Sequence, residues 1–64
     1  MVTQYEIKVY HPSGDLAALI LRYAASAQEA AEVAASDYPK AGWIEARFWD
    51  ELYVIELPNQ IEEE

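Results

Sequence analysis

The alanine-rich stretch after Ser26 constrains the fold more than any other part of the sequence. Residues 26–29, Ser-Ala-Gln-Glu, form a capping box: the serine hydroxyl accepts a hydrogen bond from the amide of Glu29, whose carboxylate reaches back to the amide of Ser26. Pro39 disfavours helical geometry at the residue before it and ends the helix. Helical spacing gathers small side chains into a thin stripe, which lets the helix lie close to a sheet. The stripe consists of Ala27, Ala30, Ala31, Ala34 and Tyr38.

The residues before this helix predict a β-hairpin. Thr3–His11 alternates with period two, as a half-buried strand does. Pro12–Asp15 has turn residues, because proline presets φ and glycine supplies a left-handed position. Leu16–Ala25 is the expected returning strand, and its orientation is open because Leu16–Leu21 is apolar on both sides. The residues of the first strand that we expect to face the core are Tyr5, Ile7 and Val9.

A third strand is expected after the helix, at Trp43–Trp49, with Ile44, Ala46 and Phe48 on its core side. Asp50-Glu51 then forms a two-residue turn into a further strand, Leu52–Leu57. This register pairs Phe48 with Tyr53, Ala46 with Ile55, Ile44 with Leu57, Arg47 with Val54 and Glu45 with Glu56. It places apolar residues on one face, but it also opposes two glutamates, so the pairing of the last strand is left open.

The expected fold class is therefore α+β, with an antiparallel sheet of three to four strands and one helix packed on it. The order is β-β-α-β, followed by the extra C-terminal strand whose pairing is open. We expect a single domain at residues 1–58 and an acidic C-terminal tail at residues 59–64, because Asn59–Glu64 ends in three glutamates.

Charge and composition narrow the function classes. Twelve acidic against four basic residues give a formal net charge of −8, which opposes direct binding to nucleic acid or an anionic membrane. The chain has no cysteine and one histidine, so no thiolate or multi-histidine metal site is expected. No segment has the pattern of a membrane span or a signal peptide. We expect a monomeric, cytoplasmic binding protein with no cofactor.

Catalysis is not expected from a chain of 64 residues that includes eleven alanines, because it has little interior from which to shape a pocket. His11 has no neighbouring group to orient it, so we interpret it as a strand-end residue beside a turn.

The outer side of the third strand is the best candidate for a binding surface. Tryptophan and arginine are the residues most enriched at interface hot spots. Two alternatives stay open: the tryptophans pack into the domain's own core, or Arg47 only forms an internal salt bridge. Glu29 and Glu32, on the exposed side of the helix, either meet a basic partner or only solvate that surface. The third-strand residues of this candidate surface are Trp43, Glu45, Arg47 and Trp49.

Residues 23–47 resemble a known family. The resemblance lies in Tyr23-Ala24-Ala25-Ser26-Ala27-Gln28-Glu29-Ala30-Ala31-Glu32-Val33-Ala34, then Tyr38, Ala41-Gly42 and Arg47. This pattern is similar to that of the small early protein of T7-like bacteriophages that inhibits the host RNA polymerase (the gene product 2 family). That protein has the same size and a similar order of a hairpin, a helix and a further strand.

The resemblance implies a partner and a mechanism. The partner would be the jaw domain of the β′ subunit of bacterial RNA polymerase, at the downstream DNA channel. The family blocks open-complex formation there, together with the amino-terminal region of the housekeeping σ factor. An arginine important for this contact falls on Arg47, and a second family arginine falls on Trp49, where this chain departs from the pattern. Of the negative strip on the family's helix, Glu29 and Glu32 are retained.

Two other functions compete with polymerase inhibition. An acidic DNA mimic directed at a nuclease or a CRISPR complex would depend on the carboxylates together and hardly on Arg47. A small oligomerising module would instead pair through an open sheet edge.

Overall fold

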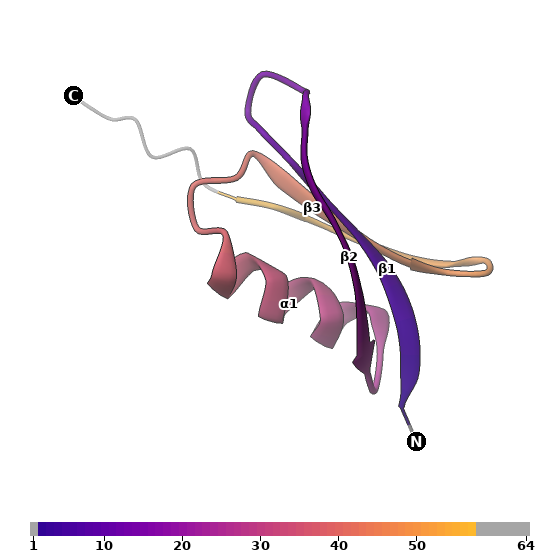
Figure 1. The fold of residues 1–64 in the computed structure, drawn as a ribbon. Helices are drawn as coiled ribbons and strands as arrows, with labels where there is room; N and C mark the ends of the chain where they lie inside the picture. Colours follow the sequence, from indigo (N-terminus) through magenta and orange to yellow (C-terminus); the bar gives the residue numbers. More distant parts are fainter. Residues whose placement is uncertain (1, 58–64) are drawn as a thin grey trace.

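A computed structural model describes residues 2–57 of the chain. Four strands form one antiparallel sheet in the order β2-β1-β3-β4, and a single helix covers one of its faces (Figure 1). This confirms the expected α+β class, with the fourth strand as a full member of the sheet. The tail at residues 59–64 lies outside the described residues. The elements are β1 (Thr3–Tyr10), β2 (Leu16–Ala24), α1 (Ala27–Asp37), β3 (Trp43–Phe48) and β4 (Glu51–Glu56).

The core lies between α1 and the sheet and is built mostly from small residues. The strand residues predicted to face inward, Tyr5, Ile7 and Val9, are all buried. On the helix, Ala27, Ala30, Ala31 and Ala34 are buried as the stripe predicts. The largest fully buried side chains are Ile7, Ile44 and Val9. Because alanine projects so little from the helix, α1 lies close enough to the sheet for three aliphatic side chains to fill the space between them.

The helix begins at the predicted cap, with one difference. The amide of Glu29 donates to Ser26 Oγ at 3.1 Å, while the Glu29 carboxylate accepts from the amide of Ala25 at 2.9 Å, one residue earlier than expected. At the other end, the amide of Tyr38 donates to the carbonyl of Ala34, and the helix stops before Pro39. Within residues 2–57 no helix is long and apolar enough to cross a membrane.

A carboxylate near the second hairpin ties three elements together. Glu51, the first residue of β4, accepts from Tyr5 Oη at 2.9 Å and from the backbone amide of Ala27, in the first turn of α1, at 3.2 Å. It thereby satisfies one of the amides that a helix leaves unpaired at its start. Burial of the Tyr5 hydroxyl, then its bond to Glu51 and the negative charge there, raise the pKa of Tyr5 above its ordinary value of 10.0.

The β3–β4 hairpin corrects the predicted register. Phe48 pairs with Glu51, Ala46 with Tyr53, Ile44 with Ile55, Arg47 with Leu52 and Glu45 with Val54. The two turn residues are therefore Trp49 and Asp50, so the predicted Asp50-Glu51 turn was wrong by one residue and its pairings were wrong by two. A shift of two in the pairing keeps every side chain on the same face, so alternation alone does not detect it. The observed register also removes the Glu45–Glu56 opposition, because Glu56 lies opposite Trp43.

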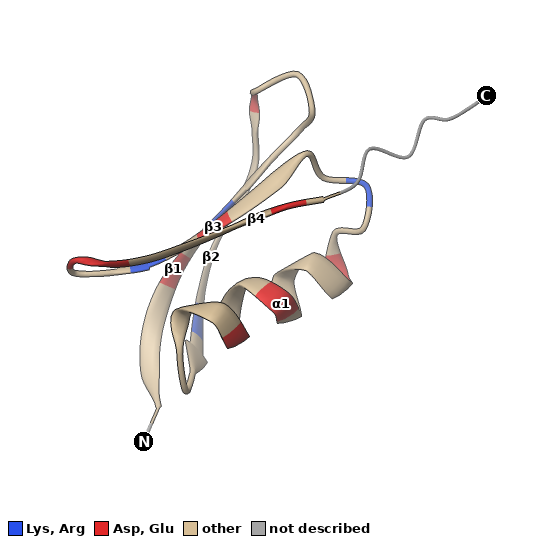
Figure 2. Ribbon diagram, turned by 180° about the vertical axis from the view of Figure 1, so that it is seen from behind, with Lys and Arg blue, Asp and Glu red and all other residues tan. Residues whose placement is uncertain are grey.

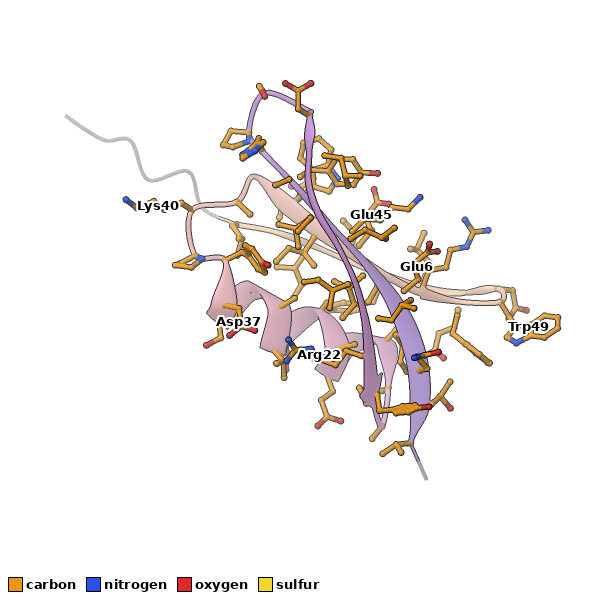
Figure 3. All side chains as sticks on the ribbon, viewed as in Figure 1. Glu6, Arg22, Asp37, Lys40, Glu45 and Trp49 are labelled. Carbon is orange, nitrogen blue, oxygen red and sulfur yellow. The ribbon has the colours of Figure 1, made fainter. Side chains whose placement is uncertain are left out.

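The structure also settles the orientation of β2. Ala18, Ile20 and Ala24 face the helix side, where Ala24 is buried and the other two are partly buried. Arg22, also on this side, makes the one salt bridge among residues 2–57, with Asp37 at 3.1 Å near the end of α1 (Figure 3). The two side chains are 34% and 51% exposed, so solvent screens this bridge and it contributes little to stability.

Candidate binding face of the sheet

The sheet face opposite α1 is not covered by any described element of the chain. Strand residues alternate between the two faces, and residues paired across strands share a face, so the pairing register defines this second face. We call it the open face. Its residues are Gln4, Glu6, Lys8 and Tyr10 on β1; Leu16, Leu19, Leu21 and Tyr23 on β2; Trp43, Glu45 and Arg47 on β3; and Leu52, Val54 and Glu56 on β4.

Four charged residues occupy the centre of the open face in alternating signs. Glu6 on β1 lies opposite Arg47 on β3, and in the next row Lys8 lies opposite Glu45. None of these side chains reaches an oppositely charged group of residues 2–57 within 4.0 Å, and they surround a hollow of about 50 Å³. Figure 3 shows Glu6 and Glu45 on the side of the sheet away from the helix. We call these four residues the charge square.

Apolar side chains flank the charge square on both edge strands. Leu21 and Leu52 continue the row of Glu6 and Arg47, while Leu19 and Val54 continue the next row. With Tyr23, these side chains are between 43% and 63% exposed. A strand that is apolar on both sides is typical of one covered on both faces. Here β2 has only one face covered, so its outward leucines are available to a second molecule.

Aromatic residues close one end of the open face. Trp43 stacks on Tyr10, with ring centroids 4.7 Å apart and an interplanar angle of 14°, and its Nε1 donates to Glu45 Oε2 at 3.2 Å. The stack and this hydrogen bond together hold the Trp43 indole between the Tyr10 ring and the Glu45 carboxylate. Trp43 is thus half-buried on the open face and is not part of the core.

Trp49 lies at the other end, in the turn rather than in the strand. It is 79% exposed and has a φ of 56°, a left-handed conformation that is unfavourable for a bulky residue. Arg47 Nε donates to the Trp49 carbonyl at 3.4 Å, and the Phe48 ring meets the indole edge-on. A shallow groove of about 350 Å³ runs from this turn onto the open face. It is lined by Gln4, Glu6, Leu21, Arg47, Phe48 and Trp49.

The structure brings together four of the six predicted site residues. Trp43, Glu45 and Arg47 share the open face and Trp49 adjoins it, so neither tryptophan packs in the core and Arg47 forms no salt bridge with the described residues. Glu29 and Glu32 lie on α1, in the other layer of the molecule (Figure 2). There the Glu29 carboxylate caps the helix, and Glu32 accepts from Gln28 at 3.0 Å.

Sequence reasoning missed the apolar flanks of this surface. Leu19, Leu21 and Tyr23 belong to the strand whose orientation was left open, and Leu52 and Val54 belong to the strand whose pairing was uncertain. The available signal was the two-sided apolar run in β2, which is more apolar than a strand with one wet face requires.

His11 has a structural role in the first hairpin. Its backbone amide donates to the carbonyl of Asp15 at 2.8 Å, and its carbonyl accepts from the amide of Gly14 at 2.9 Å, which closes the turn. The side chain is exposed. Within residues 2–57 no group of three histidine or carboxylate side chains is placed to hold a metal ion.

Comparison of the chain with protein-family models, with curated proteins and with solved structures found no match. The open face has a mixed-charge centre, apolar flanks and a tryptophan at each end.

Proposed function

We propose that this protein is a non-catalytic inhibitor that docks its open face on a protein partner, and that this partner is bacterial RNA polymerase. The observation that carries the docking surface is the exposure of Leu19, Leu21, Tyr23, Leu52 and Val54 together on one uncovered sheet face. Contiguous apolar area of this kind, rimmed by polar residues, marks interaction sites on soluble proteins.

Arg47 is the expected anchor of this surface. It lies between Glu6 and Leu52, and its planar guanidinium has no carboxylate of residues 2–57 within 4.0 Å. An arginine whose guanidinium has no carboxylate partner among residues 2–57 can pair with a carboxylate or carbonyl of the partner in two parallel hydrogen bonds. Trp49 beside it offers a large exposed ring on a strained backbone, a combination that recurs at functional sites.

The choice of RNA polymerase comes from the resemblance of residues 23–47 to the phage inhibitor family. It points to the β′ jaw domain as the surface that Arg47 contacts, with Trp49 in place of the family's second arginine. The protein would act in the cytoplasm of the bacterial host and block open-complex formation, with the amino-terminal region of σ as a further contact.

The two layers of the domain suit a protein that occupies a DNA channel. When the open face is docked, α1 points away from the partner with Glu29, Glu32 and Asp37 on its solvent side (Figure 2). A negative surface directed into the channel repels the DNA phosphates while the bulk of the domain excludes them. Inhibition in this scheme needs no catalysis and no cofactor.

The test is capture of purified bacterial RNA polymerase by the immobilised protein, together with an abortive-initiation assay. Arg47→Glu should weaken capture by about 30-fold or more, as expected when a hot-spot residue worth about 2 kcal/mol is lost. Lys40→Glu is the matched control, because it makes the same change of charge in the loop after α1, away from the open face (Figure 3). Circular dichroism confirms that both variants are folded.

A second variant tests the turn. Trp49→Asn relieves the left-handed strain, since asparagine tolerates φ near +56° better than tryptophan, and removes the exposed ring. It should be at least as stable as the wild type and bind polymerase more weakly. Undiminished capture by Arg47→Glu would disprove the assigned surface.

The DNA-mimic alternative is supported by the exposed carboxylates of α1. It predicts the opposite result, with binding to a nuclease or CRISPR complex that survives Arg47→Glu and is lost when Glu29 and Glu32 are changed to glutamine.

A further inference from the structure

We infer that the open face also pairs with the open face of a second copy of this chain, forming a weak two-fold symmetric dimer. The carrying observation is the charge square, in which Glu6, Arg47, Glu45 and Lys8 alternate in sign around a small hollow. Each of these side chains lacks an oppositely charged partner within 4.0 Å among residues 2–57.

Such a square is complementary to itself. In a symmetric dimer both copies use the same patch. If one residue of the first copy contacts a second residue of the other copy, the reverse contact is also made. If two open faces meet about a two-fold axis that runs parallel to the strands, β1 of one copy lies over β3 of the other. Glu6 then lies over the second copy's Arg47, and Lys8 over the second copy's Glu45. All four positions of the square face the opposite charge.

The apolar flanks match under the same operation. The axis places β2 of one copy over β4 of the other, because these are the two edge strands of the sheet. Leu21 then lies over the second copy's Leu52, and Leu19 over its Val54. The aromatic end also meets itself, with Trp43 over Tyr10. An axis perpendicular to the strands matches the charges as well, but it places Tyr10 over Gln4 and loses the aromatic contact.

The area of the face predicts a weak dimer. Four strands spaced about 4.8 Å apart, with about six residues each at about 3.3 Å, give a footprint of about 400 Å² per copy. Two such faces bury an area at or below the roughly 1,200 Å² of the smallest stable interfaces. Sheets that pack face to face lie about 10 Å apart, so the charged side chains of both copies can interdigitate.

Net charge sets the conditions under which the dimer forms. Two chains of −8 repel each other, but the open face itself holds three acidic and two basic residues, so the local repulsion is small. At about 0.15 M salt the Debye length is about 8 Å, and charges elsewhere on the two copies are largely screened from each other.

Self-association would hide Arg47 and the leucines of β2 and so compete with polymerase for the same face. This consequence rests on the proposed function, whereas the dimer itself does not. Binding to polymerase would then require the monomer, and the protein would be most active when dilute.

The experiment is sedimentation equilibrium of the wild type and charge variants from about 10 μM to about 1 mM, a range that covers weak association. The wild type should shift from monomer toward dimer. Lys8→Glu alone and Glu45→Lys alone should each remain monomeric, because each places two pairs of like charges across the interface. An equimolar mixture of the two variants should restore the dimer, since the introduced glutamate of one chain then faces the introduced lysine of the other.

Controls separate this result from misfolding and from net charge. Lys40→Glu and Glu32→Lys make the same two charge changes off the open face and should leave the wild-type behaviour unchanged. The double variant Lys8→Glu with Glu45→Lys keeps opposite charges within each chain and should dimerise like the wild type. Thermal melts followed by circular dichroism report folding in every case.

The same measurements give two results that would overturn the dimer. A wild type that stays monomeric at about 1 mM overturns the inference, as does a mixture that associates no better than its separate variants. Capture of polymerase by the dilute wild type is scored separately. A wild type that captures polymerase but does not dimerise removes only this inference. A wild type that dimerises but does not capture polymerase removes only the proposed function.

Discussion

Replacing Ile7 by alanine tests which face of the sheet is the core. Ile7 is 0% exposed on β1 and is one of only three large side chains that are fully buried among residues 2–57. Leu21 on β2 is 63% exposed on the other face. Both substitutions to alanine remove the same number of carbon atoms, so the composition changes equally and only the location differs.

The expected magnitudes differ widely. Loss of a fully buried isoleucine costs about 2–5 kcal/mol through lost transfer energy and the cavity left behind. A chain of 64 residues has a total stability of roughly 3–10 kcal/mol, so Ile7→Ala should remove a large part of it. Loss of the exposed leucine should change stability by no more than about 0.5 kcal/mol.

The assay is thermal unfolding followed by circular dichroism, at low protein concentration so that association does not contribute. Ile7→Ala should lower Tm by at least about 10 °C, because a domain of this size loses about 4–8 °C for each kcal/mol. Leu21→Ala should leave Tm within a few degrees of the wild type and still weaken polymerase capture and self-association. Equal losses of stability in the two variants would refute the assignment of the faces.

Two further predictions concern the loops and the pH dependence. Gly42→Ala should destabilise the domain by about 1–3 kcal/mol in urea titrations, because its new Cβ would lie 2.6 Å from the Cα of Pro12. The Cβ of Gly14→Ala would meet no atom within 4 Å, but the residue must keep a φ of +102°. The expected loss of stability, about 1 kcal/mol, therefore comes from backbone strain alone. A larger loss for Gly14→Ala than for Gly42→Ala would contradict the close packing of Gly42 against Pro12. The pKa of Tyr5 is higher in the folded protein than its ordinary value of 10.0. The contribution of Tyr5 to folding stability is therefore complete below pH 10.0 and is lost as the pH rises through the pKa of the folded state. Tyr5→Phe should therefore flatten the alkaline fall in Tm. Parallel curves of Tm against pH for Tyr5→Phe and the wild type would exclude this linkage.

Local signals were sufficient to predict the elements and the inner face of the fold. The cap at Ser26, the alanine stripe and the break at Pro39 each depend on residues within a few positions of one another, and all three are confirmed. The alternation of β1 likewise predicted the burial of Ile7 and Val9. The fold class follows from these elements, because one thin helix can only cover one side of a small sheet.

Contacts between residues far apart in the chain could not be predicted from local sequence patterns. The register of β3 and β4 depends on the turn, where Trp49 adopts a left-handed conformation that its residue type does not favour. Glu51 was predicted to be a turn residue, whereas its carboxylate joins Tyr5 to the start of α1, a contact across 46 positions of the chain. No pattern within a short stretch of sequence predicts the conformation of Trp49 or the contacts of Glu51.

The distribution of charge connects the fold to both proposals. Three acidic and two basic residues lie on the open face, so this face is almost neutral although the chain carries −8. The six other acidic residues that the structure places lie at the two turns, at the start of β4 and on α1, away from the open face. The acidic surface outside the open face repels other copies of the chain at long range. At short range the open face, with its mixed charges and apolar flanks, attracts a second surface. An arrangement of this kind favours weak pairing of identical faces and tighter pairing with a surface that is less acidic. A partner that lines a DNA channel is basic, so it should displace the second copy, and raising the salt concentration should weaken capture of the partner more than it weakens the dimer.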